Sequence, residues 1–360
     1  MTNTHDVVME INDVRVQHMS RQNERWIAAW LLACCVLVFS MIVVGGVTRL
    51  THSGLSIVEW QPIVGTLPPL NEHQWQQAFD LYKLTPEYKQ VNFAMGLSEF
   101  KEIFWWEYFH RLLGRAIGFV FLIPYAVLLL KRRLHGLLAW RLLGIFVLGG
   151  LQGAMGWYMV KSGLVDDPRV SHLRLTAHLA IAFVILAAMF WVALDLLFPR
   201  TPVRPDPRTA GMRRIAGTLV SLTFLLMLTG GLVAGIRAGF AYNTFPLMNG
   251  HIVPPEIFML DPWYLNFFNN MATVQFDHRV LAWLLAFLVP WYWWQAIHAG
   301  LNAHIRLASH LLLAVLAVQI ALGISTLLLV VPIPLAAAHQ GGAVLLFAAA
   351  LYNAHALASA

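Results

Sequence analysis

The sequence predicts an all-α polytopic membrane protein, with eight transmembrane helices arranged as two pseudo-symmetric, parallel four-helix bundles. Of its 360 residues, 59% are hydrophobic and only 12% are charged, whereas about 25% of the residues of a soluble protein are charged. Eight apolar runs approach or exceed the length of about 20 residues that a helix needs to cross a bilayer. These runs are Trp26–Val47, Phe104–Leu130, Leu138–Val160, Leu173–Phe198, Ile215–Ile236, Thr273–Ile297, Leu307–Val331 and Leu335–Ala358.

An internal repeat predicts the two bundles. Glycines and a proline recur at a constant offset of 185 residues, in the pairs 45/230, 46/231, 54/239, 65/250 and 69/254. The register continues with shorter offsets, which are 168 for His110 and His278 and 161 for His178 and His339. Because each unit holds an even number of spans, both units would enter the membrane in the same orientation, unlike the inverted repeats of many transporters.

Charge gives the predicted boundaries and orientation. The predicted parts are an N-terminal segment 1–25, a first bundle 26–198 with a long outer loop 49–103, a linker 199–214, and a second bundle 215–360. Lysines and arginines gather at 131–133 and in the linker, which marks these connectors as cytoplasmic. Both termini would then be cytoplasmic in a bacterial inner membrane. The net charge of +6 is explained by these connectors, so no nucleic-acid partner is predicted.

Four histidines stand out because the repeat pairs them: His110 with His278, and His178 with His339. Each lies near the start of an even-numbered span, so all four would share one depth toward the outer face. Facing helices of a bundle are common places for cofactor sites, and two imidazoles across an apolar cavity suit a haem iron. Zinc would need three or four closed ligands. The sequence therefore predicts two bis-histidine haem sites, with His172 as an alternative to His178.

One difference separates the two predicted sites. Glu107 stands three residues before His110, and Gln275 stands three residues before His278. Residues three apart on a helix share a face, so only the first site has a carboxylate that can act in proton transfer. The alternative is a surface salt bridge between Glu107 and Arg111. The arginines at the outer ends are predicted to contact haem propionates or to mark the interface; they are Arg49, Arg111, Arg115, Arg237 and Arg279.

Over nearly its whole length the chain resembles the haem A synthases, the haem O oxidases of terminal-oxidase assembly. Four pieces carry the resemblance: Gly-Gly-Val-Thr-Arg-Leu-Thr-x-x-Gly-Leu-Ser at 45–56, Glu-Tyr-Phe-His-Arg at 107–111, Phe-Asp-His-Arg at 276–279 and Ala-His-Gln-Gly at 338–341. The long first loop is similar to that of the mitochondrial and alphaproteobacterial branch. Some members carry a cysteine pair in an outer loop, which this chain lacks.

The resemblance implies oxidation of the C8 methyl group of haem O to a formyl group, through a hydroxymethyl intermediate. Our hypothesis for the mechanism is that water supplies the oxygen. It implies that His110 and His178 bind the substrate haem, that His278 and His339 bind a haem b cofactor, and that Glu107 is the essential carboxylate. The implied partners are haem O, the lipid bilayer and haem O synthase (protohaem farnesyltransferase). The sequence identifies no electron acceptor and leaves a homo-oligomer open.

The main alternative function is electron transfer by a di-haem b-type cytochrome that oxidises quinol and modifies neither haem. In typical membrane cytochromes b, two histidines on one helix serve two stacked haems, whereas here each helix offers one. A haem carrier would need neither the acid nor two permanent ligand pairs. The contrast between Glu107 and Gln275 therefore favours an enzyme.

Overall fold

A computed structural model describes residues 4–59, 64–164, 168–199 and 207–358. Within this part of the chain, eight helices are long and apolar enough to cross a membrane, which confirms the predicted all-α membrane fold. The eight are α1 (Thr4–Leu50), α4 (Leu97–Leu130), α5 (Gly136–Lys161), α6 (His172–Leu197), α7 (Pro207–Gly235), α9 (Met271–His298), α10 (Ala303–Leu328) and α11 (Ile333–Ala358).

Some helices begin earlier than the apolar runs do. Helix α4 begins at Leu97, because the Glu99 carboxylate accepts a hydrogen bond from the Gly96 backbone N–H at 2.9 Å and so caps the first turn. Helix α7 begins at Pro207, a residue that suits the first turn of a helix. Hydropathy alone misses such polar turns. The predicted linker 199–214 is therefore helical from 207 onward, and 200–206 lie outside the described residues.

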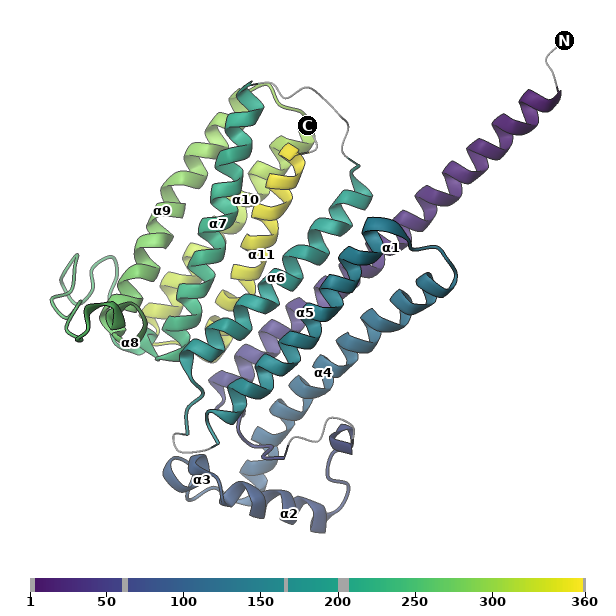
Figure 1. Ribbon diagram of the computed structural model, residues 1–360. Helices are drawn as coiled ribbons and strands as arrows, with labels where there is room; N and C mark the ends of the chain where they lie inside the picture. Colours follow the sequence, from purple (N-terminus) through teal and green to yellow (C-terminus); the bar gives the residue numbers. More distant parts are fainter. Residues whose placement is uncertain (1–3, 60–63, 165–167, 200–206, 359–360) are drawn as a thin grey trace.

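The same order of helix contacts occurs in both halves of the chain (Figure 1). In the first half α1 packs on α4, α4 on α5, α5 on α6, and α6 returns to α1. In the second half α7, α9, α10 and α11 contact one another in the same cyclic order. The halves meet where α6 packs on α7, α1 on α11, and α6 on α11. Each half is therefore a ring of four helices.

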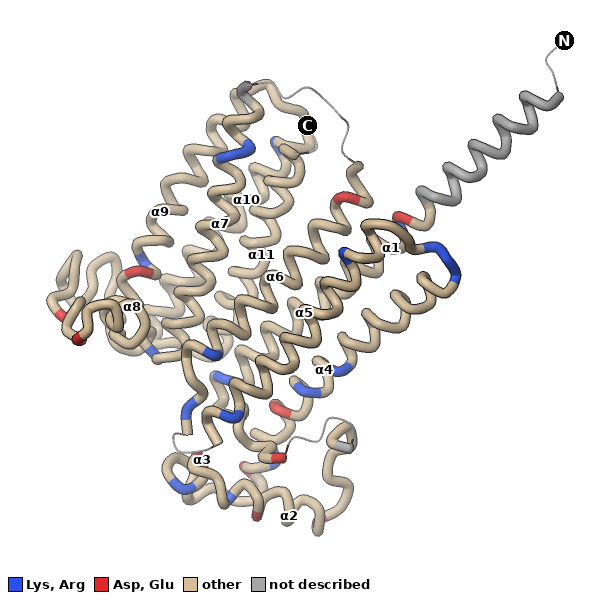
Figure 2. The backbone as a smooth tube through the Cα atoms, in the orientation of Figure 1, with Lys and Arg blue, Asp and Glu red and all other residues tan. Residues whose placement is uncertain are grey.

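Apolar side chains fill the junction between the halves. Phe183 of α6 contacts Phe347 of α11 edge to face, with ring centroids 6.4 Å apart, and both are buried. Figure 2, in which the backbone is coloured by residue type, shows that the charged residues of the described chain lie mainly toward the helix ends and in the loops. This pattern fits a surface that meets hydrocarbon, where charged groups are costly.

The first long loop is a small folded unit at one end of the bundle, which we call the loop end (Figure 1). It contains η1 (Val64–Thr66), α2 (Glu72–Lys83) and α3 (Pro86–Gln90). Its core is a buried aromatic cluster shared with the first turns of α4 and formed by Trp75, Phe79, Tyr82, Phe100, Phe104 and Tyr108. The second long loop also lies at the loop end and contains η2 (Ala238–Phe240), η3 (Trp263–Leu265) and α8 (Asn266–Asn269).

Glu87 is a buried carboxyl in this first loop, only 5% exposed. Burial raises the pKa of Glu87 to about 7, the Glu107 charge adds to the rise, and a hydrogen bond from Tyr82 opposes it. A carboxyl with a raised pKa holds its proton longer in the folded than in the unfolded chain. Stability of the loop should therefore fall as pH rises from about 4.5 to about 7, by on the order of 3 kcal/mol.

We expect Glu87→Gln to remove this pH dependence, because the amide is neutral throughout. At pH 8 the variant loop should exchange its backbone amides more slowly than the wild-type loop, and at pH 5 the two should be nearly equal. Hydrogen exchange of residues 72–91, compared at each pH, measures this. Glu102→Gln, at an exposed position on α4, is the control. Equal exchange in wild type and Glu87→Gln at pH 8 would contradict the assignment.

Candidate functional site

Each of the four repeated histidines packs against a glycine of a neighbouring helix. A Cβ added to Gly45 of α1 would lie 2.9 Å from Nε2 of His110, and one added to Gly230 of α7 would lie 3.2 Å from Cε1 of His278. The other two pairs are Gly156 with His178, at 3.1 Å, and Gly323 with His339, at 2.8 Å. The glycines hold corresponding positions of the repeat, so the same close approach is made in both halves.

Two glutamines hold the histidines of α6 and α11. Gln152 of α5 contacts Nε2 of His178 at 3.2 Å. Gln319 of α10 contacts Nδ1 of His339 at 3.1 Å and donates to its backbone carbonyl at 2.9 Å. In both glutamines Oε1 is buried and accepts no hydrogen bond. Such neighbours fix the ring orientation of a ligating histidine, and their loss typically lowers metal affinity about 10- to 100-fold.

The histidines of each ring of helices lie near each other in pairs. His110 and His178 lie close enough to interact electrostatically, and so do His278 and His339. Among the described residues, no three His, Cys, Asp or Glu side chains gather into a metal site. Paired imidazoles backed by glycine, with Nδ1 of His178 buried and unpartnered, would suit the binding of a haem iron. The assignment of these two pairs as haem ligands stays a prediction.

His172 occupies a different environment from His178. It is the first residue of α6. A Cβ added to Gly235 of α7 would lie 2.5 Å from the Cβ of His172. His172 thus packs at the junction of the two halves, while His178 faces Gly156 and Gln152 within the first ring. This placement favours His178 over the alternative ligand.

We expect Gly323→Ala to lower the haem content of the purified protein by about 10- to 100-fold, as loss of a ligand-orienting neighbour does. The new methyl group would lie 2.8 Å from Cε1 of His339 and would force the imidazole to move. Gly217→Ala on α7 is the matched control, because no atom lies within 4 Å of its added Cβ. Both variants gain the same helix propensity. Haem per chain measures the effect, and equal haem content in the two would refute this role for Gly323.

Glu107 lies at the floor of the first long loop and accepts four hydrogen bonds. Arg111 donates twice to Oε1, from Nε at 3.1 Å and from a terminal nitrogen at 2.6 Å. Ser56 Oγ and the Ile57 backbone N–H donate to Oε2 at 2.7 and 2.8 Å. The ion pair with Arg111 is therefore present, but its carboxylate is only 3% exposed. It is a buried pair that joins the loop to α4, rather than a surface pair.

Gln275, the corresponding residue of the second half, differs from Glu107 in its hydrogen bond to the loop. Gln275 accepts from Arg279 at 2.8 Å, as Glu107 does from Arg111. Its other atom, Nε2, donates to the Ala238 carbonyl at 2.7 Å. The first long loop thus presents hydrogen-bond donors to Glu107, and the second presents an acceptor to Gln275. Each loop is complementary to the residue that it contacts, a carboxylate in the first half and an amide in the second.

The predicted arginines divide into two groups at the loop end. Arg111 and Arg279 each donate to carbonyls of the preceding loop, at Ile57 and Tyr242. Arg49 donates to the Ala234 carbonyl at 2.5 Å. Arg237 contacts Nδ1 of His52 at 3.1 Å, and Arg115 lies one turn beyond Arg111 on α4. Arg49 and Arg237 thus join the two halves, while Arg111 and Arg279 secure the loops.

Burial and the positive charges of Arg237 and Arg49 lower the pKa of His52. Its ring is therefore neutral at pH 7, and Nδ1 is able to accept the hydrogen bond from Arg237. No motif in the sequence indicates that His52 contacts Arg237 or that Ser56 donates to Glu107. Positions 52 and 237 differ by the repeat offset of 185, so equivalent positions of the two halves meet at this contact.

Comparison with known proteins identifies the family. Residues 28–351 match COX15-CtaA, described as cytochrome oxidase assembly protein. The chain belongs to the COX15-CtaA family. Similar family members include proteins named "Heme A synthase" from Nitrosospira multiformis, 62% identical, and Nitrosomonas eutropha, 59% identical, each match covering 92% of this chain and 93% of the relative. Another, from Parvibaculum lavamentivorans, is 48% identical over 93% of this chain and 95% of the relative.

Proposed function

We propose that this member of the COX15-CtaA family oxidises the C8 methyl group of haem O to the formyl group of haem A, through a hydroxymethyl intermediate. The observation that carries the proposal is the carboxylate of Glu107 three residues before His110, where the second half has the amide Gln275 before His278, in a chain that matches relatives named "Heme A synthase" over nearly its full length. Conversion of a methyl group and one water to a formyl group releases four electrons and four protons. An oxidoreductase with a nearby proton acceptor suits this stoichiometry.

In this proposal the two halves have different tasks. His110 and His178 hold the substrate haem O in the first half, and His278 and His339 hold a resident haem b in the second. The contact pattern common to the two rings of helices and the glycine behind each histidine support two related sites. When bound, the haem b supplies one-electron redox chemistry. The product, haem A, serves terminal oxidases.

Glu107 would act on the substrate through its charge. In each of the hydrogen bonds described above, the Glu107 carboxylate is the acceptor, and the donors are Arg111, Ser56 and the Ile57 N–H. A negatively charged group fixed in this way stabilises positive charge that develops at the substrate methyl carbon, and it needs no reorganisation to do so. To accept a proton, Glu107 would first have to release one of these donors, and Ser56 is the uncharged side chain among them.

Several finer points belong to the same proposal. The arginines at the loop end are the proposed propionate contacts: Arg49, Arg111, Arg115, Arg237 and Arg279. The loop end faces outward from a bacterial inner membrane, and both termini are cytoplasmic. Haem O synthase delivers the substrate. The chain acts in the bilayer, alone or as a homo-oligomer.

The alternative of a di-haem b-type electron-transfer cytochrome gains no support, because the matching relatives are named as synthases and because an electron carrier has no use for an acid at one site. Haem extraction from the purified membrane protein tests the proposal. Haem B together with haem O, haem A or the hydroxymethyl form is the expected result. Haem B alone, with no conversion of added haem O, would overturn it.

A further inference from the structure

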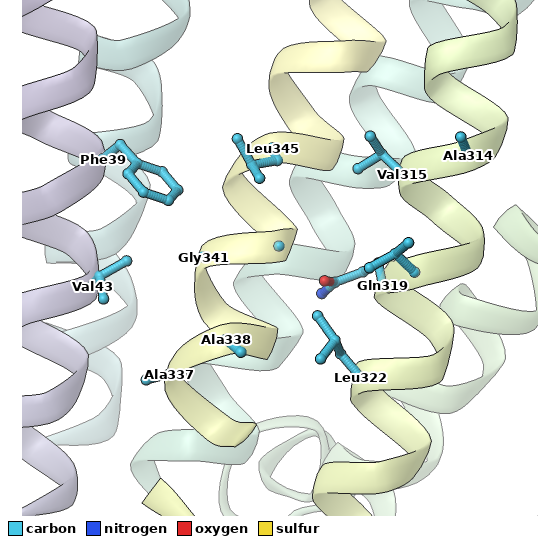
Figure 3. A pocket seen from close by; sticks show the side chains of 12 residues that line it. Phe39, Val43, Ala314, Val315, Gln319, Leu322, Ala337, Ala338, Gly341 and Leu345 are labelled. Atoms are coloured by element: carbon cyan, nitrogen blue, oxygen red, sulfur yellow. The ribbon is translucent and has the colours of Figure 1, made fainter. Parts of the chain in front are cut away.

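Three of the four repeated histidines make a hydrogen bond through a ring nitrogen. Two of these bonds are the glutamine contacts described above, and Figure 3 shows one of the glutamines, Gln319, reaching from α10 toward α11. The third joins Nδ1 of His278 to the hydroxyl of Thr229 on α7 at 3.0 Å. Because this hydroxyl donates its hydrogen to the Leu226 carbonyl at 2.9 Å, its oxygen accepts a hydrogen from Nδ1. The tautomer with a proton on Nδ1 leaves Nε2 free to bind a metal ion.

His110 is the exception among the four. Within the part of the chain that the structure describes, no group forms a hydrogen bond with either ring nitrogen of His110. The difference lies at positions 44 and 229, which the repeat offset of 185 pairs. Thr229 immediately precedes Gly230, the glycine that packs against His278. Val44 holds the same place before the glycine that packs against His110. A valine side chain has no hydrogen-bonding atom, so the first half offers no counterpart of the Thr229 hydroxyl.

A hydrogen-bonded neighbour affects how firmly a histidine holds a metal. Such neighbours fix the orientation of the imidazole, and their loss typically lowers metal affinity about 10- to 100-fold. In the second half both paired histidines have one, supplied by Thr229 and Gln319. In the first half only His178 has one. The two halves thus offer unequal sites, one with two fixed ligands and one with a fixed and an unfixed ligand.

We propose that Val44 makes His110 the exchangeable ligand of the first haem site, so that this half takes up haem O and releases haem A while the second half keeps its haem b. The inference rests on the proposed function, in which the substrate haem is bound in the first half. Val44 and Thr229 are positioning residues, because each acts through its histidine. Release breaks only the bond between the iron and one imidazole nitrogen, and it transfers neither an electron nor a proton. A resident cofactor has no need of such an exchangeable ligand.

Exchanging the two side chains tests this proposal, because threonine and valine have nearly the same shape. Val44→Thr places a hydroxyl beside His110, and we expect haem O added to the purified full-length protein to dissociate about 10- to 100-fold more slowly. Thr229→Val removes the hydroxyl beside His278, and we expect haem b to dissociate faster by the same factor. Dissociation is measured as transfer of haem to excess apomyoglobin, with the transferred haem identified by chromatography.

Two variants with the same substitutions at other positions are the controls. Val43→Thr adds a hydroxyl one residue earlier on α1, where the side chain faces Gly341 of α11 and lines an apolar groove between α1, α10 and α11 (Figure 3). Among the described residues that line this groove, Gln319 is the one polar side chain. Thr223→Val removes a buried hydroxyl of α7 that donates to the Leu219 carbonyl of its own helix at 2.7 Å. We expect both controls to release each haem at the wild-type rate.

The outcomes separate hydrogen bonding from packing, and this inference from the proposed function. Thr229→Ser keeps the hydroxyl without the methyl group, and we expect it to hold haem b as firmly as wild type does. Equal release of haem O by wild type and Val44→Thr would overturn the inference, and so would retention of haem b by Thr229→Val or equally fast loss of both haems from it. Conversion of haem O by a wild-type protein whose variants release haem at unchanged rates would overturn the inference alone. Exchange rates that follow the substitutions, in a protein that never converts haem O, would overturn the proposed function alone.

Discussion

The Glu107→Gln variant is expected to form haem A at least about 100-fold more slowly than wild type while still binding haem, which is the range of effect for loss of a positioned acid or base. The amide removes the negative charge, and its NH₂ group would face either the two donors of Arg111 or those of Ser56 and Ile57. The four histidines proposed as ligands pack against glycines of neighbouring helices, and these contacts do not involve Glu107. Haem A formed per chain, with the haem content measured in parallel, gives the result.

A second variant separates the charge of Glu107 from its role in holding the loop. Ser56→Ala removes one hydrogen bond of 2.7 Å but keeps the carboxylate and its pair with Arg111. We expect it to slow conversion only about tenfold, equivalent to 1.4 kcal/mol. Wild-type activity in Glu107→Gln would remove the residue from the mechanism. Equally large losses in both variants, with equal loosening of the loop to proteolysis, would assign Glu107 a structural role.

Replacing one histidine of each pair should remove different haems. His278→Ala is expected to abolish the haem b of the purified protein, and His110→Ala to keep haem b but lose haem O and haem A. Loss of a ligand should exceed the 10- to 100-fold effect of losing a ligand's neighbour, so less than about 1% of the affected haem should remain. Extracted haems separated by chromatography, with a reduced-minus-oxidised spectrum, distinguish the two.

His172→Ala is the control for this pair of variants, because His172 packs against Gly235 at the junction of the halves and not within a histidine pair. We expect its haem content to match wild type. Loss of haem O from His172→Ala together with full retention by His178→Ala would show that the ligand in α6 was assigned wrongly. Loss of both haems from either His110→Ala or His278→Ala would contradict separate sites.

The sequence alone determined the membrane fold and singled out the four paired histidines that we propose as haem ligands. Apolar runs of about 20 residues have few structural alternatives in a bilayer, because each backbone polar group must be satisfied within its own helix. The offsets of 168 and 161 selected His110, His178, His278 and His339 from 15 histidines. A duplicated chain repeats its functional positions, so this signal needed no coordinates.

Only the tertiary structure decided what surrounds those residues. Ser56 and Ile57 meet Glu107 across 50 or more positions of the chain, and such a contact leaves no periodic signal in the sequence. The polar first turns of α4 were also missed, since capping rather than hydropathy determines where that helix begins. The groove beside Gln319 depends on three helices from both halves. Its existence follows from packing, which the order of residues along one helix does not specify.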